Sequence, residues 1–255
     1  MSIDNQTVAL SEIPAPGLNE VQRITGVFYQ PSKTFQDLNR SANWFYAWLV
    51  IYAFSLLFTI SVGQKIGWQQ VQDNSIKLGP ASRREQLEKL PPDQHAQQMK
   101  IGLVFTKVIS YGFPVLVLIW LVIVALILWI TFSFGLGAEI NFAKSLAIVV
   151  FASLPGILHA LMATLVVWAG VDPETFNIQN AVGTNPGWYM NILDSPRFVY
   201  YLATSLDVFI LWTLFLTGLG FSVVAKVKKG TAMAVVYGWW ALVTLIFSAI
   251  GAAFS

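Results

Sequence analysis

Two ionisable side chains lie inside otherwise apolar stretches and are the strongest candidates for chemistry in this sequence. His159 belongs to the stretch 145–168, and Asp207 belongs to the stretch 198–224. Ionisable groups within a membrane are costly and usually face a protein interior or a water-filled cavity. At a rise of 1.5 Å per helical residue, both side chains lie about 13 Å from the same end of their stretches. We therefore predict that His159 and Asp207 form an intramembrane polar pair that serves as a binding site.

Two interpretations of this pair stay open. A hydrogen bond between the imidazole and the carboxylate would satisfy both groups and join two helices. Alternatively, the pair forms a proton relay or a polar ligand site, in which His159 titrates near neutral pH and Asp207 holds its orientation. Pro155, one turn before His159, removes a backbone donor and favours a kink that would widen a cavity there.

Other kinds of site have little support in the sequence. The chain has no cysteine, and its two histidines, His95 and His159, are far apart. It contains no Walker-type glycine loop, dinucleotide fingerprint or nucleophile elbow. A net charge of +2 from scattered basic residues also lacks the clustered basic face of a nucleic-acid binder. We therefore expect no catalytic residue, no metal, no cofactor and no nucleic-acid partner.

The composition requires most of the chain to lie in lipid. Apolar residues make up 56% of the sequence, charged residues only 11%, and the mean hydropathy is +0.62. Five stretches are long enough to cross a hydrocarbon core of about 30 Å as helices. They cover approximately residues 44–62, 108–134, 145–168, 198–224 and 232–254. The sequence thus predicts an all-α integral membrane protein, in which residues 44–255 form a bundle of five transmembrane helices.

The segment before the first span is predicted to hold an interfacial helix. Apolar residues between Gln22 and Asn39 recur at helical spacing, and Pro31 suits the first turn of a helix. Residues 1–43 therefore form a cytosolic amino-terminal segment. Its helix either docks a protein or lipid partner or only rests on the headgroups.

A helical hairpin is predicted outside the membrane between the first two spans. Ser82 and Glu85 have the spacing of a capping box, and Pro91 and Pro92 end the helix that follows it. The next helical pattern runs without a break into the second span. Farther along, residues 171–196 are rich in turn-forming residues and are predicted to form a lid over the same end of the bundle, either as a functional loop or as a packing cap.

The orientation depends on the distribution of lysine and arginine. A plain count places seven on one side of the membrane and eight on the other, so the charge-poor and short loops decide. Lys226, Lys228 and Lys229 crowd the short turn between the last two spans, whereas residues 171–197 contain one basic residue. We therefore expect the amino terminus in the cytoplasm and the carboxyl terminus outside.

The chain resembles the Yip family of five-span membrane proteins, and within it the bacterial branch. The resemblance covers most of the chain from about Phe28 and rests on Pro31 and Phe35 before Trp44, on the stretch Asp172-Pro173-Glu174-Thr175-Phe176-Asn177, and on Thr184-Asn185. The eukaryotic branch is associated with vesicle traffic, Rab-type GTPases and the shaping of endoplasmic reticulum and Golgi membranes. The resemblance implies a non-enzymatic membrane adaptor.

Two functional hypotheses follow. The first is a scaffold or adaptor in membrane organisation or trafficking, which contacts membrane lipids, proteins at the cytosolic face and, through the glycine pairs 63/67 or 218/220, a second copy of itself. The second is a small transporter or channel with His159 and Asp207 in its path. A water-accessible cavity at that pair would favour transport, and a dry, closed pair would contradict it.

Overall fold

A computed structural model describes residues 17–253, and every regular element within them is helical. Residues 1–16 of the predicted amino-terminal segment, and Phe254 at the end of the predicted fifth span, lie outside the described residues. The elements are α1 (Glu20–Tyr29), α2 (Pro31–Asp37), α3 (Phe45–Lys65), α4 (Trp68–Lys77), α5 (Ala81–Glu88), α6 (Pro92–Ile130), the π-helical η1 (Thr131–Gly135), α7 (Phe142–Ala152), α8 (Gly156–Trp168), the 3₁₀ turn η2 (Pro186–Tyr189), α9 (Arg197–Ser205), α10 (Val208–Val224) and α11 (Lys229–Ala253).

By length and composition, four helical segments can cross a membrane, and a fifth can if a bent pair of helices counts as one span. The four are α3, α6 with η1, α7 with α8, and α11. The bent pair is α9 with α10, whose axes are bent by 56° from a straight line. The prediction of an all-α, multi-pass membrane bundle is confirmed. Pro155 lies at the predicted interruption of the third span, between α7 and α8.

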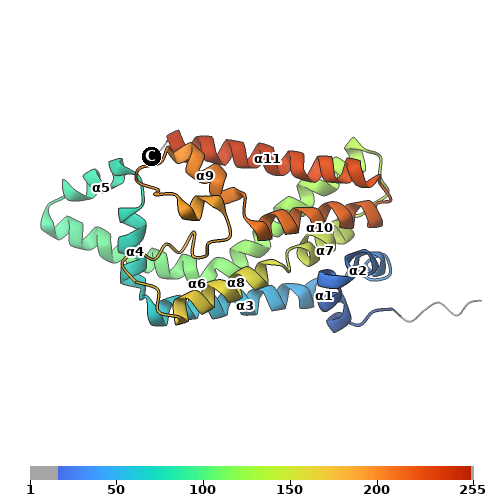
Figure 1. The fold of residues 1–255 in the computed structure, drawn as a ribbon, viewed down its shortest axis with the longest axis horizontal. Coiled ribbons are helices and arrows are strands. Elements are labelled where there is room, and N and C mark those ends of the chain that lie inside the picture. The colour runs from blue at the N-terminus through green and yellow to red at the C-terminus, as the bar shows by residue number, and fades with distance from the viewer. Residues whose placement is uncertain (1–16, 254–255) are drawn as a thin grey trace, which may run out of the picture.

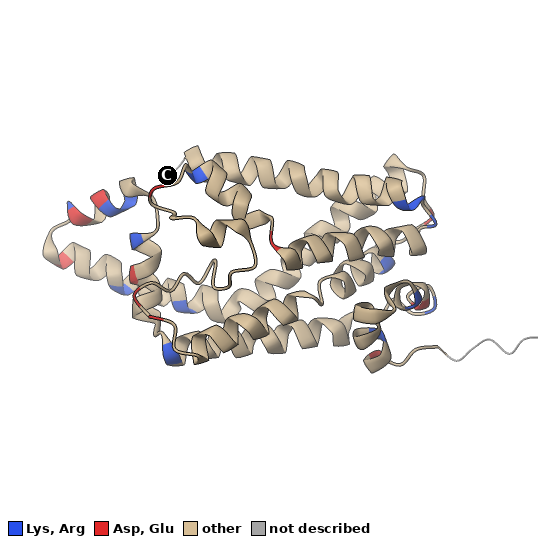
Figure 2. Cartoon of the chain, in the orientation of Figure 1, with Lys and Arg blue, Asp and Glu red and all other residues tan. Residues whose placement is uncertain are grey.

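The long helices lie side by side, so that the extramembrane elements gather at the two ends of the bundle (Figure 1). We call one end the amino-terminal end; it carries α1, α2, the connection 131–141 and the lysine turn 225–228. We call the other the lid end; it carries α4, α5, the lid 171–196 and α9. Charged residues lie mostly at these two ends (Figure 2), as a bundle embedded in lipid requires.

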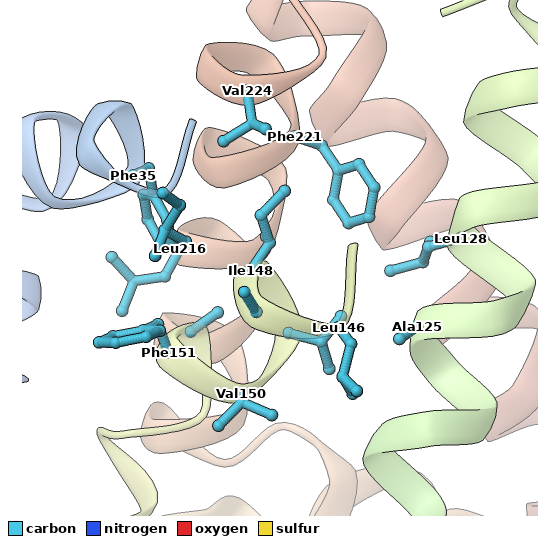
Figure 3. Close-up of a cluster of buried hydrophobic side chains, with 14 of the residues drawn as sticks. Phe35, Ala125, Leu128, Leu146, Ile148, Val150, Phe151, Leu216, Phe221 and Val224 are labelled. Atoms are coloured by element: carbon cyan, nitrogen blue, oxygen red, sulfur yellow. The ribbon is translucent and has the colours of Figure 1, made fainter. Parts of the chain in front are cut away.

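The main core lies toward the amino-terminal end, around α7 (Figure 3). Phe132 stacks on Phe221 with ring centroids 4.3 Å apart. A Cβ atom at Gly220 would lie 2.5 Å from Ile148, and one at Gly218 would lie 2.5 Å from the sulfur of Met233. These two glycines therefore let α10 pack closely against α7 and α11 within one chain, and this packing explains them without a second copy.

Helices α1 and α2 form a compact pair at the amino-terminal end. A capping box begins α1, because Asn19 Oδ1 accepts from the backbone N–H of Gln22 and Gln22 Oε1 accepts from that of Asn19. Pro31 is the first residue of α2, as predicted. A Cβ atom at Gly26 would lie 2.5 Å from Thr34 Oγ1, so this glycine allows the two helices to approach.

The hairpin α5–α6 is confirmed, but two details of the predicted connection differ. Helix α5 begins at Ala81 after Pro80 and no side chain caps it, so the capping box predicted at Ser82 does not form. The segment before α5 also contains a helix, α4. Gly67, at φ +83°, makes the sharp turn from the end of α3 into α4. Asn74 of α4 donates to the carbonyl oxygens of Pro173 and Phe176, which fastens this helix to the lid.

The predicted fourth span is broken where a single helix was expected. The carboxylate of Asp207 accepts hydrogen bonds from the backbone N–H groups of Phe209 and Ile210, at 2.8 and 3.4 Å. An aspartate bonded in this way caps a new helix and does not continue an old one. Asp207 therefore begins α10, and α9 leans away from the bundle axis.

Candidate functional site

The carboxylate of Asp207 is buried at the break between α9 and α10, with 5% of the residue exposed. Besides the two backbone donors of α10, it accepts hydrogen bonds from the hydroxyl of Thr184 and from the side-chain amide of Asn185. Both donors belong to the lid. The carboxylate thus lies at a helix N-terminus, where the helix dipole favours negative charge.

His159 lies beside this group but makes a different contact. Its ring packs edge-on against Phe209, with ring centroids 5.6 Å apart. Within the described residues, no hydrogen bond joins His159 to Asp207. The structure thus brings both predicted residues to the same level of the bundle, but the carboxylate of Asp207 accepts its side-chain hydrogen bonds from the lid and not from His159.

The break in the fourth span also changes the expected depth of the pair. Helix α10 has 17 residues, which at 1.5 Å each gives about 25 Å of a hydrocarbon core of about 30 Å. Asp207 therefore lies near the lid-end boundary of the hydrocarbon core, and shallower than a continuous helix from Phe198 would place it.

A polar network extends from Asp207 through the lid. Asn185 donates to Asn180, which donates to the hydroxyl of Tyr200 in α9. Arg197, the first residue of α9, donates to the carbonyl oxygens of Leu78 and Gly79, at 2.9 and 3.1 Å. The lid is therefore joined to α4, α9 and α10, which favours a packing cap.

A second cluster of charges lies at the amino-terminal end, and sequence analysis missed it. Arg23 in α1 is only 1% exposed and binds Oδ2 of Asp37 in α2, with nitrogen to oxygen distances of 2.6 and 2.7 Å. Arg23 also lies 3.4 Å from Glu20, and Arg40 binds the other oxygen of Asp37 at 3.2 Å. The signal in the sequence was an arginine on the apolar face of an amphipathic helix.

Burial and hydrogen bonding act in opposite directions on Asp37. Burial alone would raise the pKa of this carboxyl group, but hydrogen bonds from Arg23, Arg40 and the backbone N–H of Leu18 lower it below its ordinary value of 3.8. Asp37 is therefore ionised at neutral pH and neutralises the buried guanidinium of Arg23.

The outer surface of this end combines apolar and basic residues. Val21 and Tyr29 of α1 are 70% and 65% exposed. In the turn that follows α10, Lys226 is exposed and has a φ of +54°, and Lys228 and Lys229, which follow closely in the sequence, are also exposed. Exposed apolar side chains and exposed lysines at one end of a bundle are suited to contacts with a membrane surface or with a protein partner.

The described residues contain no cluster with the composition of a metal centre. No group of three or more histidine or acidic side chains could hold a metal ion there. Two cavities formed by residues 17–253 lie at the lid end beside α6, and neither is lined by His159 or Asp207.

Most of the chain matches a known protein family. Residues 25–250 match the Yip1 domain. The chain belongs to this family. Among curated proteins and solved structures, none matches it. The match includes α2 to α10 entirely, the second half of α1 and most of α11, so the hairpin and α2 lie within the Yip1 domain. Assignment to the bacterial branch stays a prediction.

Proposed function

We propose that this Yip family protein is a non-enzymatic membrane scaffold, which uses its amino-terminal end to contact a protein or lipid partner in the cytoplasm. The observation that supports this proposal is the fixed attachment of α1 and α2. Arg23, Val27, Phe35 and Leu38 are all buried against the bundle, so the pair is held in place without a partner. Val21 and Tyr29 remain exposed on the rigid unit that results.

The placement in the membrane is part of the proposal and can be tested directly. Because the chain contains no cysteine, a single cysteine can be introduced at Ser32 or at Lys77, at opposite ends of the bundle. In sealed cells, a membrane-impermeant maleimide should label the variant with cysteine at position 77 and spare the one at position 32. The reverse pattern would place the amino terminus outside and contradict the proposed cytoplasmic docking.

The scaffold role is tested by site-specific photocrosslinking in the native membrane. A photoreactive amino acid at Val21 or at Tyr29 should give a discrete protein or lipid adduct. The adduct from position 21 should be weakened by Tyr29→Glu, and the adduct from position 29 by Val21→Glu. The matched control is Tyr189 in the lid, which is 74% exposed at the other end. Equal adducts from all three positions would contradict a docking role for α1.

The second candidate function is a small transporter or channel that uses His159 and Asp207. The observation that favours it is the broken span, since interrupted membrane helices often mark substrate sites in transporters. Asp207→Asn retains an N-cap side chain but removes the charge. Ion or proton flux in proteoliposomes that Asp207→Asn and His159→Gln both abolish would support transport, and no flux above that of empty vesicles would contradict it.

A further inference from the structure

The hairpin at the lid end borders an open cavity that neither proposed function uses. Helix α5 and the beginning of α6 project from the bundle (Figure 1), and a space of about 480 Å³ lies between them and α4. This volume is within the range of about 300–1,000 Å³ that is common for small-molecule sites. No residue of α5 is buried, so this helix covers the cavity without being fixed by the core.

The lining of the cavity is apolar along the hairpin and polar at particular points. Leu87, Leu90 and Met99 belong to the apolar part, and Arg83 and Gln72 belong to the polar part. Such a surface fits an amphipathic molecule with a long apolar portion and a charged or hydroxylated head.

A second, wide-open hollow, lined only by residues of α6, continues the first one along this helix toward the membrane. The two share Ile101 and Phe105, and the second also includes Val104 and Val108. These four residues have the spacing of one helical face and are 56–65% exposed. An exposed apolar stripe therefore leads from the cavity down to the bilayer.

This stripe lies beyond the length that α6 needs for crossing the membrane. About 20 helical residues span the hydrocarbon core, and counted back from Ile130 they reach Tyr111. Ile101 lies ten residues farther, about 15 Å at 1.5 Å per residue. The chain thus presents an apolar path where headgroups and water surround it.

Two polar groups at the cavity lack partners among the described residues. Gln72 is 5% exposed and donates from Nε2 to the carbonyl oxygen of Met99 at 3.0 Å, whereas its Oε1 accepts no hydrogen bond. The exposed guanidinium of Arg83 forms no ion pair there. A ligand with a hydrogen-bond donor and an anionic group would satisfy both residues.

We propose that the hairpin binds an anionic phospholipid, with one acyl chain along the stripe of α6 and the headgroup at Arg83 and Gln72. The positive charge of Arg83 favours a phosphate group. The apolar stripe connects the cavity with the membrane-spanning part of α6, which favours a lipid from the adjacent leaflet. Helix α5 moves to admit the headgroup. This site is independent of the scaffold function proposed above, because it lies at the opposite end of the bundle.

The test uses the full chain in nanodiscs of zwitterionic lipid that contain a small fraction of phosphatidylglycerol with a photoreactive acyl chain. Mass spectrometry then locates the labelled residues. Labelling at Met99–Phe105 and at Leu87–Leu90 should exceed labelling at the exposed positions farther along the same helix, which are Val115, Leu116, Ile119, Trp120 and Ile123. With a photoreactive phosphatidylcholine, the excess should be several-fold smaller.

Two variants alter the site in different ways. Met99→Trp fills the cavity and should reduce labelling there roughly tenfold, which corresponds to about 1.4 kcal/mol of lost contact. Arg83→Gln should reduce labelling by phosphatidylglycerol to the level of phosphatidylcholine. Val115→Trp, at a lipid-facing position of α6 that is 49% exposed, is the matched control and should change neither.

A further variant tests the same site in case Met99→Trp fails to fold. A Cβ atom at Gly102 would lie 2.5 Å from Gln72 Nε2, so Gly102→Ala displaces this amide and should also weaken labelling. Uniform labelling from Ile101 to Ile123 that no variant changes would mean contact with bulk lipid only and would overturn the proposal. Crosslinks between two copies at the stripe would overturn it as well.

Discussion

The two ends of the bundle differ in how firmly their extramembrane helices are attached. At the amino-terminal end, Val27, Phe35 and Leu38 are completely buried, and a buried ion pair joins α1 to α2. At the lid end, α5 has no buried residue and borders an open cavity. A bundle of this kind can therefore hold one docking surface rigid while the opposite end adjusts to a ligand.

The largest effect should come from Phe35→Ala at the amino-terminal end. Phe35 is fully buried and lies next to Gly220, where a smaller side chain would leave a void between α2 and α10. Truncation of a buried phenylalanine costs about 3–5 kcal/mol of unfolding free energy. Reversible unfolding in mixed micelles measures the change.

The matched control for this variant is Phe113→Ala in α6, at a position that is 52% exposed. It should cost much less, because lipid or detergent replaces the lost contacts. If both variants had equal effects, α1 and α2 would not be part of the folded core, and the contrast between the ends would disappear.

The next largest effect should come from Asp37→Asn. The change leaves Arg23, which is 1% exposed, with Glu20 at 3.4 Å as its remaining acidic neighbour. A buried charge that loses its partner costs about 3–5 kcal/mol, and Glu20 should reduce this loss toward the lower value. Hydrogen exchange of α1 should rise strongly while that of α11 stays constant; equal protection of α1 in both proteins would contradict the prediction.

The same pair predicts that acid loosens the amino-terminal end. Because the folded-state pKa of Asp37 lies below 3.8, ionisation of this group stabilises the fold above that pH, and the contribution is lost as the pH falls from 3.8 through the lower folded-state value. Proteolysis or hydrogen exchange at α1 should accelerate in that window. Asp37→Asn serves as the control, because its exchange should lack this pH-dependent step.

The sequence predicted the spans and the hairpin but not the elements that depend on tertiary contacts. Apolar length alone defined the five membrane segments, and Pro31 and Pro155 marked local geometry correctly. The break at Asp207 was not predicted, because the burial of its carboxylate depends on Thr184 and Asn185, which come from the distant lid. Likewise, the partner of Arg23 is 14 residues away in another helix.

A smaller effect should separate the two roles of Asp207 at the lid end. Asp207→Ala removes both the N-cap of α10 and the anchor of the lid, and loss of a cap costs about 0.5–2 kcal/mol. Asp207→Asn retains the cap and should cost less. Unfolding in micelles measures both, and equal losses would show that charge, and not capping, stabilises the break.

The smallest effect should come from Glu85→Gln in the hairpin. Glu85 lies 3.8 Å from Lys89, with 65% and 78% of the two side chains exposed. Exposed pairs one helical turn apart contribute only about 0.3–0.5 kcal/mol, since water screens the charges and both side chains lose freedom. Unfolding free energy should therefore stay within about 0.5 kcal/mol of the parent protein. A loss as large as that of Asp37→Asn would mean that α5 is held as firmly as α1, and the proposed opening of the hairpin to a lipid would then be too costly.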